Sequence, residues 1–250
     1  INITDQRECS KIFSSFKPDY VFHLAAHSRI PIAIKNPIES CDVNVVGTCN
    51  MLQQSREHGV KRFMFSSTSS VYGLKNKCPL NEDMPRDCLN PYSVSKAAAE
   101  DLCKMYYNLF DLETVIFRYF NVYGERQPLK GQYAPLIGIF QNQKDAGQPM
   151  TVVGDGKQTR DFTYVGDVVK ANILAAHSDN PDILGEVFNV GTGKNYSVLD
   201  VADIIGGETK FIENRPGEAR ETLADLTKIK NLLGYEPSID LADWIKSYGS

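Results

Sequence analysis

The chain has 250 residues, of which 42% are hydrophobic and 23% are charged. These proportions allow a sizeable buried core and exclude intrinsic disorder and the fibrous classes of protein. The 31 acidic residues outnumber the 27 lysines and arginines, which argues against broad nucleic-acid binding and against a polybasic membrane surface.

The first half of the sequence predicts alternating helices and strands. In chain order these are a helix capped by Thr4 and running to about Phe16, a strand at Tyr20–Ala26, a helix from Pro37 to about His58, a strand at Lys61–Ser66, a helix from Pro91 to about Phe110, and a strand at Glu113–Phe120. Two of the helices begin with an Asn-Pro pair, a cap followed by proline at the first helical position. Because the strands are continuous apolar runs, we expect a parallel sheet covered by helices on both faces.

From Gly124 the composition changes, since residues 124–162 are rich in Gly, Gln and Pro. The later predicted elements are helices at Ala134–Ala146, Asp167–His177, Val198–Ile205, Asp225–Leu233 and Leu241–Tyr248, and strands at Met150–Val153, Asp161–Tyr164, Val187–Val190 and Thr209–Ile212. The sequence therefore predicts an α/β fold with a doubly wound parallel sheet. We assign residues 1–123 and 163–193 to this sheet domain, and 124–162 and 194–250 to a smaller α/β subdomain.

The six cysteines are scattered and form no CxxC pair, which predicts free thiols of a reducing compartment and a cytoplasmic protein. No apolar run approaches the ~18 residues of a membrane span, and no signal-peptide pattern opens the chain. The four histidines have no metal-ligand spacing, so we expect no metal site.

Tyr92 and Lys96 lie four residues apart and share one face of the helix that begins at Pro91. A nearby ammonium lowers the pKa of a phenol, which makes the phenolate available as a general base. The run FSSTSSVYG (65–73) brings hydroxyl groups to the end of a buried strand, where open α/β sheets bind ligands. The alternatives are a solvated helix face for the Tyr-Lys pair and a self-satisfied turn for the hydroxyl-rich loop.

A further run, HLAAHS (23–28), follows another strand with small residues that allow close approach of a flat ligand or tight internal packing. The order of motifs resembles the extended short-chain dehydrogenase/reductase superfamily. Within it, the chain is similar to nucleotide-sugar epimerases of the UDP-glucose/UDP-N-acetylglucosamine 4-epimerase type. The motifs that carry the resemblance are HLAA, NVVGT (44–48), FSSTSSVYG, NPYSVSK (90–96), RYFNVYG (118–124), TRDFTYVGDV (159–168), FNVGTG (188–193) and RPGE (215–218).

The resemblance implies an NAD-dependent isomerase that oxidises a sugar at C4 to a transient 4-keto form and returns the hydride to the other face. It makes Tyr92 the base, Lys96 the residue that holds the nicotinamide ribose and depresses the pKa of Tyr92, and Thr68 the third catalytic group. The remaining cofactor contacts that it implies are Leu24, Ala25, Ala26, Ser28, Asn44, Ser66 and Tyr119. Its substrate contacts, besides Thr68, are Asn121, Tyr133, Ala134, Val152, Val153, Arg160, Arg215, Glu218 and Thr222.

Arg160 and Arg215 match diphosphate-binding arginines, whose forked guanidinium suits phosphate oxygens, although alone they would resemble surface ion-pair residues. Related 4,6-dehydratases carry an Asp-Glu pair where this chain has Ser69 and Ser70, and related decarboxylases carry a glutamate at the second position. We therefore expect epimerisation rather than dehydration. The resemblance also implies that Thr222 occupies a position where a bulky residue in this family narrows the sugar pocket and a small one admits an N-acetyl group. Its small size therefore predicts tolerance of UDP-N-acetylhexosamines as well as, or instead of, UDP-hexoses.

Two rival functions stay open, a keto-sugar reductase that consumes its cofactor and a non-catalytic binder of nucleotide sugars. By family analogy we expect a homodimer built on the helices at 37–58 and 91–110. Family members begin with a Gly-rich GxxGxxG turn that holds the NAD pyrophosphate. That turn has no counterpart in this sequence, and INITD matches a loop reached after two βα units. We thus expect a piece of a protein of roughly 300 residues, and poor NAD binding without turnover from these residues alone.

Overall fold

The computed structural model describes residues 1–131, 134–213 and 219–248. Its strands are β1 (Tyr20–His23), β2 (Arg62–Thr68), β3 (Glu113–Tyr119), β4 (Asn121–Tyr123), β5 (Met150–Val153), β6 (Thr159–Tyr164), β7 (Val187–Val190), β8 (Asn195–Ser197) and β9 (Thr209–Ile212). Its α-helices are α1 (Gln6–Phe16), α2 (Ile30–Lys35), α3 (Pro37–Cys41), α4 (Gly47–Glu57), α5 (Pro91–Phe110), α6 (Leu136–Asp145), α7 (Val165–His177), α8 (Val198–Ile205), α9 (Thr227–Leu233) and α10 (Leu241–Tyr248). A π-helical turn, η1 (Asp42–Val46), joins α3 to α4, and short 3₁₀ turns lie at η2 (Ser69–Tyr72) and η3 (Pro181–Ile183).

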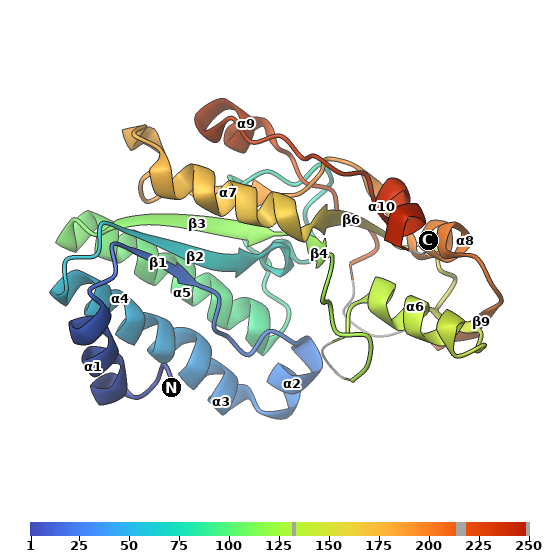
Figure 1. Cartoon of the computed structure of the whole chain (residues 1–250), viewed down its shortest axis with the longest axis horizontal. Coiled ribbons are helices and arrows are strands. Elements are labelled where there is room, and N and C mark those ends of the chain that lie inside the picture. Colours follow the sequence, from blue (N-terminus) through green and yellow to red (C-terminus); the bar gives the residue numbers. More distant parts are fainter. Residues whose placement is uncertain (132–133, 214–218, 249–250) are drawn as a thin grey trace.

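The main sheet is parallel and has the strand order β1-β2-β3-β7. Helices α4 and α5 lie along one face, and α7 and α9 lie along the other (Figure 1). The register pairs Thr68 of β2 with Tyr119 of β3. Because all four strands run the same way, their carboxyl ends meet along one edge, where ligands bind in folds of this kind. The predicted doubly wound α/β class is confirmed.

Strand β2 is buried along its whole length because both faces of the sheet are covered. Phe63 and Phe65 belong to the core that the sheet shares with α1, α4 and α5. Met64, between them, belongs to the opposite core, which α7 and α9 help to close. Side chains alternate across a strand, so a strand buried on both faces needs apolar residues at consecutive positions.

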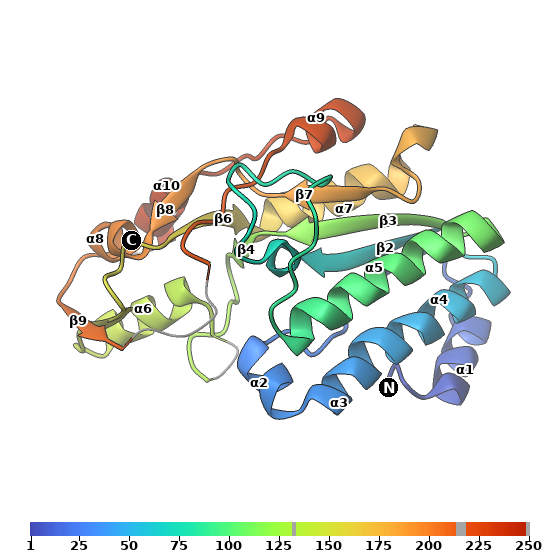
Figure 2. The same cartoon turned by 180° about the vertical axis from the view of Figure 1, so that it is seen from behind.

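The second part of the molecule contains the sheets β4-β6-β8 and β5-β9 with helices α6, α8 and α10. These elements gather at the end of the molecule away from α1, as both views show (Figures 1 and 2). Their core includes Phe140, Val152 and Trp244. The C-terminal boundary differs from the sequence assignment, because Ile229 of α9 and Tyr235 pack into the main core instead.

Some element boundaries also differ from the sequence predictions. Helix α1 is capped by Asp5 rather than Thr4, since the Asp5 carboxylate accepts hydrogen bonds from the backbone N–H groups of Arg7 and Glu8. Strand β1 ends at His23, three residues earlier than predicted. Helix α2, the short strands β4 and β8 and the turn η1 were not predicted, because such short segments carry little periodicity.

Candidate active site

Helix α5 begins beside the carboxyl end of β2. Its first turn is set by Asn90, whose side chain accepts a hydrogen bond from the Ser93 backbone N–H at 3.0 Å, and by Pro91 in the first helical position. The helix therefore starts where the Asn-Pro pair predicted. This start places Tyr92 in the first turn and Lys96 one turn later on the same face.

The phenol of Tyr92 meets the hydroxyl of Thr68 at this edge of the sheet. Thr68 is buried at the end of β2, and its Oγ1 also accepts a hydrogen bond from the Ser70 backbone N–H at 3.1 Å. Burial raises the pKa of Tyr92, whereas the hydrogen bond with Thr68 and the positive charge of Arg29 lower it. The structure thus brings together two of the three predicted catalytic groups and adds Arg29, which sequence reasoning missed.

Lys96 is almost fully buried, with 3% of its surface exposed. Its Nζ lies 4.2 Å from the centroid of the Phe65 ring on β2. Burial lowers the pKa of Lys96 to about 8, because water no longer solvates the ammonium. The expected influence of Lys96 on Tyr92 differs in this structure, since the cation that lowers the pKa of Tyr92 is Arg29 and not Lys96.

Asn44 lies in the turn η1 and is buried. Its Oδ1 accepts from the His27 backbone N–H at 2.7 Å, and its Nδ2 donates to the His27 carbonyl at 3.0 Å and to Ser95 Oγ at 2.9 Å. These contacts use both amide hydrogens of Asn44. The side chain therefore ties the loop after β1 to helix α5, and it holds the predicted cofactor loop in place instead of facing a ligand as predicted.

The other predicted cofactor contacts lie where the main strands end. After β1, Leu24, Ala25 and Ser28 are exposed and Ala26 is half-buried. Ser66 of β2 donates a hydrogen bond to the hydroxyl of Tyr119 on β3 at 3.3 Å. Burial raises the pKa of Tyr119, whose hydroxyl also accepts from Asn172 of α7 at 2.7 Å. The parallel sheet thus brings these residues to a single edge.

The predicted substrate contacts are less uniform. Arg160 lies on β6. Thr222 lies beside this strand, because the Thr222 backbone N–H donates a hydrogen bond to the Thr159 carbonyl at 3.1 Å. Val152 is fully buried in the core of the second part, so its side chain does not line a ligand site as predicted. The places of the other candidates are as follows: Asn121 is exposed, Val153 is half-buried, Ala134 is buried, and Tyr133, Arg215 and Glu218 lie outside the described residues.

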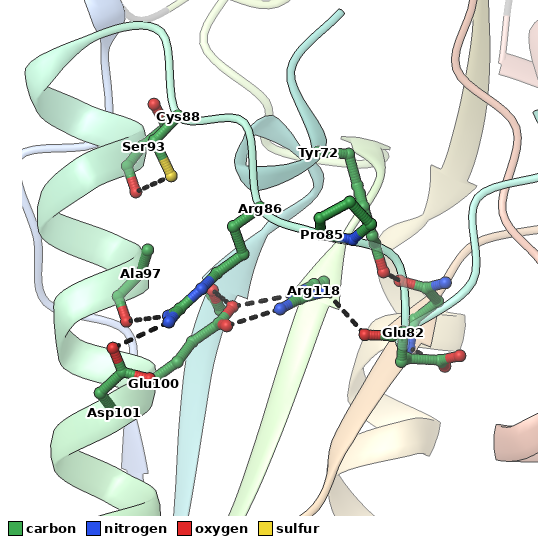
Figure 3. A network of polar contacts seen from close by, with 12 residues as sticks. Tyr72, Glu82, Pro85, Arg86, Cys88, Ser93, Ala97, Glu100, Asp101 and Arg118 are labelled. Carbon is green, nitrogen blue, oxygen red and sulfur yellow. Dashed lines mark hydrogen bonds and ion pairs between the residues drawn. The ribbon is translucent and has the colours of Figure 1, made fainter. Parts of the chain in front are cut away.

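Sequence reasoning also missed a buried polar cluster behind the site, formed by Ser67, Glu100 and Arg118. Figure 3 shows Arg118 extending from β3 toward Glu100 on α5. The Glu100 carboxylate accepts from Arg118 Nη2 at 2.7 Å and Nε at 3.0 Å, and it also accepts from the Ser67 hydroxyl. The available signal was a charged residue inside an apolar strand, since Arg118 interrupts the run TVIFRYF.

Within residues 1–131, 134–213 and 219–248, no group of His, Cys, Asp and Glu side chains is arranged to hold a metal ion. In the same part of the chain, none of the helices combines the length and the apolar character needed to cross a membrane.

Comparisons with known proteins agree with this geometry. The profile of the GDP-mannose 4,6 dehydratase family matches residues 1–248. The UDP-glucose 4-epimerase of Mycolicibacterium smegmatis is 36% identical over 241 residues, which cover 94% of this chain and 76% of that protein. The UDP-glucose 4-epimerase of Thermotoga maritima, solved with UDP-glucose, superposes with a TM-score of 0.93 at 35% identity and covers 98% of this chain and 81% of its own.

The UDP-glucuronic acid 4-epimerase of Bacillus cereus, solved with UDP-glucuronic acid and NAD, superposes with a TM-score of 0.86 at 33% identity. That match covers 96% of this chain and 76% of the other. The fold, the order of motifs and the family match lead to the same conclusion: this chain belongs to the GDP-mannose 4,6 dehydratase family within the extended short-chain dehydrogenases/reductases.

Proposed function

We propose that this protein is an NAD-dependent 4-epimerase of UDP-sugars. The observation that carries the proposal is the meeting of Thr68 and Tyr92 at the carboxyl edge of the sheet, with the buried Lys96 one helical turn away. Relatives with the same fold include UDP-sugar 4-epimerases that were solved with UDP-glucose and with UDP-glucuronic acid and NAD.

The residues at this edge suit a dinucleotide. The exposed Ala25 leaves room for close approach of a planar ring system, and Lys96 has a buried cationic head beside the site. We propose that Lys96, Ser66 and Tyr119 hold the nicotinamide half of NAD, with Leu24, Ala26 and Ser28 lining the same edge. NAD, when bound, supplies the hydride acceptor for oxidation at C4 of the sugar and the donor for its reduction.

Tyr92 would accept the proton of the sugar 4-hydroxyl and return it when the new 4-hydroxyl forms. Thr68 would orient this exchange, because its hydroxyl interacts with the phenol and lowers the pKa of Tyr92. Ser69 and Ser70, which follow Thr68, are half-buried and have no carboxyl group with which to eliminate water. This difference favours epimerisation over the dehydration named in the family description.

The decisive variant is Tyr92→Phe, which removes the proton acceptor and keeps the ring. We expect loss of UDP-galactose to UDP-glucose conversion with UDP-sugar binding retained, as measured by NMR of the products and by calorimetry. Tyr107→Phe, at the far end of the same helix, is the matched control and keeps its activity. Unchanged turnover in Tyr92→Phe would show that the proposed chemistry is wrong. Reduced cofactor that accumulates in proportion to product would identify a reductase instead.

We also propose that residues 124–162 and much of 194–250 bind the nucleotide sugar, with Arg160 and Arg215 on the diphosphate and Glu218 on the ribose. Thr222 stays the proposed gate of the sugar pocket, supported by its place beside the strand that carries Arg160. Thr222→Tyr should lower turnover of UDP-N-acetylgalactosamine relative to that of UDP-galactose. If the ratio of the two turnover rates is unchanged in this variant, Thr222 does not gate the sugar pocket.

A homodimer through α3–α4 and α5 is proposed from the apolar side chains on their outer faces. Ile38 is 86% exposed, Leu109 is 64% exposed and Val94 is 50% exposed. Leu109→Glu should give a monomer in sedimentation velocity, whereas Phe211→Glu, at an exposed apolar residue of β9, should stay dimeric. A dimer that persists in Leu109→Glu would contradict this interface. The six free cysteines support the proposed cytoplasmic location.

A further inference from the structure

Glu100 is a buried carboxylate close to the ammonium of Lys96 in the candidate site. It lies four residues after Lys96 on the same face of α5, a spacing at which a carboxylate and an ammonium normally form an ion pair. Both groups are buried, which strengthens their attraction. A pair of this kind would hold the ammonium along the helix and away from a ligand.

Glu100 instead pairs with Arg118. The guanidinium of Arg118 occupies both oxygens of Glu100, and the exposed fractions of the two side chains are 4% for Arg118 and 2% for Glu100. The ammonium of Lys96 lies over the Phe65 ring instead, and the described part of the chain places no carboxylate within ion-pairing distance of it.

The same carboxylate also reaches the strand end that carries Thr68. Ser67, the preceding residue, donates its hydroxyl to the oxygen of Glu100 that Arg118 Nε contacts. The guanidinium of Arg118 stacks 4.8 Å from the centroid of Tyr72, whose hydroxyl bonds Asn189 of β7 at 2.6 Å. The cluster therefore joins β2, β3, β7 and α5 directly behind the site.

We propose that Arg118 is a positioning residue for the epimerase reaction: by holding Glu100, it keeps this carboxylate from capturing Lys96 and locks the end of β2 against α5. This inference rests on the proposed function, in which Lys96 and Thr68 serve the reaction. Stability alone does not account for the cluster, because a buried ion pair adds little net stability compared with apolar residues of similar volume.

The charges around Lys96 make the proposal specific. The groups that act on it are His23 of β1 and Glu100 and Cys103 of α5. His23 is neutral at pH 7, because burial lowers its pKa to about 3, and burial raises the pKa of the Cys103 thiol. Glu100 is thus the charged neighbour, and Arg118 of β3 offsets its charge.

The two single variants should therefore move the pKa of Lys96 in opposite directions. Arg118→Met leaves Glu100 without its partner, so the carboxylate turns to Lys96 and raises the pKa by about one unit. Glu100→Gln leaves the Arg118 cation uncompensated near Lys96 and lowers the pKa by about one unit. In Arg118→Met/Glu100→Gln both charges are gone, and the pKa returns close to the wild-type value.

The experiment titrates the full chain with ¹³C-labelled lysine by NMR, with Lys96→Met to assign the Lys96 signal. The pH dependence of kcat is recorded in parallel, and its alkaline limb should move with the Lys96 pKa. Arg118→Met should lose about tenfold to a hundredfold in kcat at pH 7, and the double variant should recover part of that loss. The NMR titration does not require turnover, so it separates failure of this inference from failure of the proposed epimerase activity.

Arg62→Met is the matched control. Arg62 of β2 is mostly buried and forms an ion pair with the partly exposed Glu113 of β3, at the end of these strands away from Arg118, with Nη2 and Oε2 2.7 Å apart. Arg62→Met should lower the stability of the protein without shifting the pKa of Lys96. If Arg118→Met does not fold, Arg118→Lys takes its place and should give a smaller upward shift. Shifts of the same sign in both single variants, or a double variant no more active than Arg118→Met, would overturn the proposal.

Discussion

Asn44→Ala tests the link between the fold and the cofactor loop. The substitution removes the acceptor of the His27 N–H and the donor to the His27 carbonyl, together with the bond to Ser95. Ser95 keeps its hydrogen bond to the Tyr92 carbonyl. The loss of stability therefore comes mainly from the His27 N–H and C=O, which are left without their hydrogen-bond partner. At about 1–3 kcal/mol for each buried group left unpaired, and with partial access of water, we expect the free energy of unfolding to fall by about 2–4 kcal/mol.

The assay is urea unfolding followed by circular dichroism, with NAD affinity measured by calorimetry on the same samples. Asn50→Ala is the control, because Asn50 lies on the adjoining helix and its Nδ2 donates a hydrogen bond to the Ile3 carbonyl at 2.7 Å, away from the cofactor loop. We expect it to cost about 1 kcal/mol and to leave NAD affinity unchanged. If Asn44→Ala is no less stable than Asn50→Ala, then Asn44 does not anchor the loop.

Three further predictions concern buried charge and backbone geometry. Burial moves the pKa of Lys96 from 10.5 to about 8, so Lys96→Met should raise the free energy of unfolding at pH 7 by about 1–3 kcal/mol while abolishing turnover. Wild-type stability should also rise from pH 8 to 10.5, where the unfolded chain retains this proton, and a flat profile in urea unfolding would contradict the assignment. Burial lowers the pKa of His23 from 6.5 to about 3. The free energy of unfolding of the wild type should therefore decline as the pH falls from 6.5 to 3. In His23→Gln, the slope of this free energy against pH should be smaller by the equivalent of roughly one proton. Gly73 has φ +63°, and an added Cβ would lie 2.0 Å from the Asp87 carbonyl oxygen; Gly73→Ala should cost about 2–4 kcal/mol in thermal unfolding, against about 1 kcal/mol for Gly59→Ala, whose Cβ meets open space.

Local signals in the sequence were sufficient for much of the fold. Helix α5 begins at Pro91 and ends at Phe110 as predicted, because the Asn90 cap, the proline and the apolar periodicity are all encoded within the segment. The continuous apolar run of β2 likewise predicted a strand buried on both faces. The short helix α2 has no such signal, and its six residues form where packing against α5 supports them.

In the candidate site, too, local motifs predicted some features, whereas others became known only from the tertiary structure. The motifs were enough to name Thr68, Tyr92 and Lys96 as candidates, since their spacing places the last two on one helix face and the first at a strand end. Only the tertiary structure showed that the side-chain amide of Asn44 is hydrogen-bonded to the loop after β1 and to helix α5. Likewise, only the tertiary structure showed that Arg118 pairs with Glu100, 18 residues away in the sequence. Periodicity and caps act between neighbours in the chain, whereas a hydrogen bond or ion pair depends on which distant atoms the packed fold brings within about 3 Å.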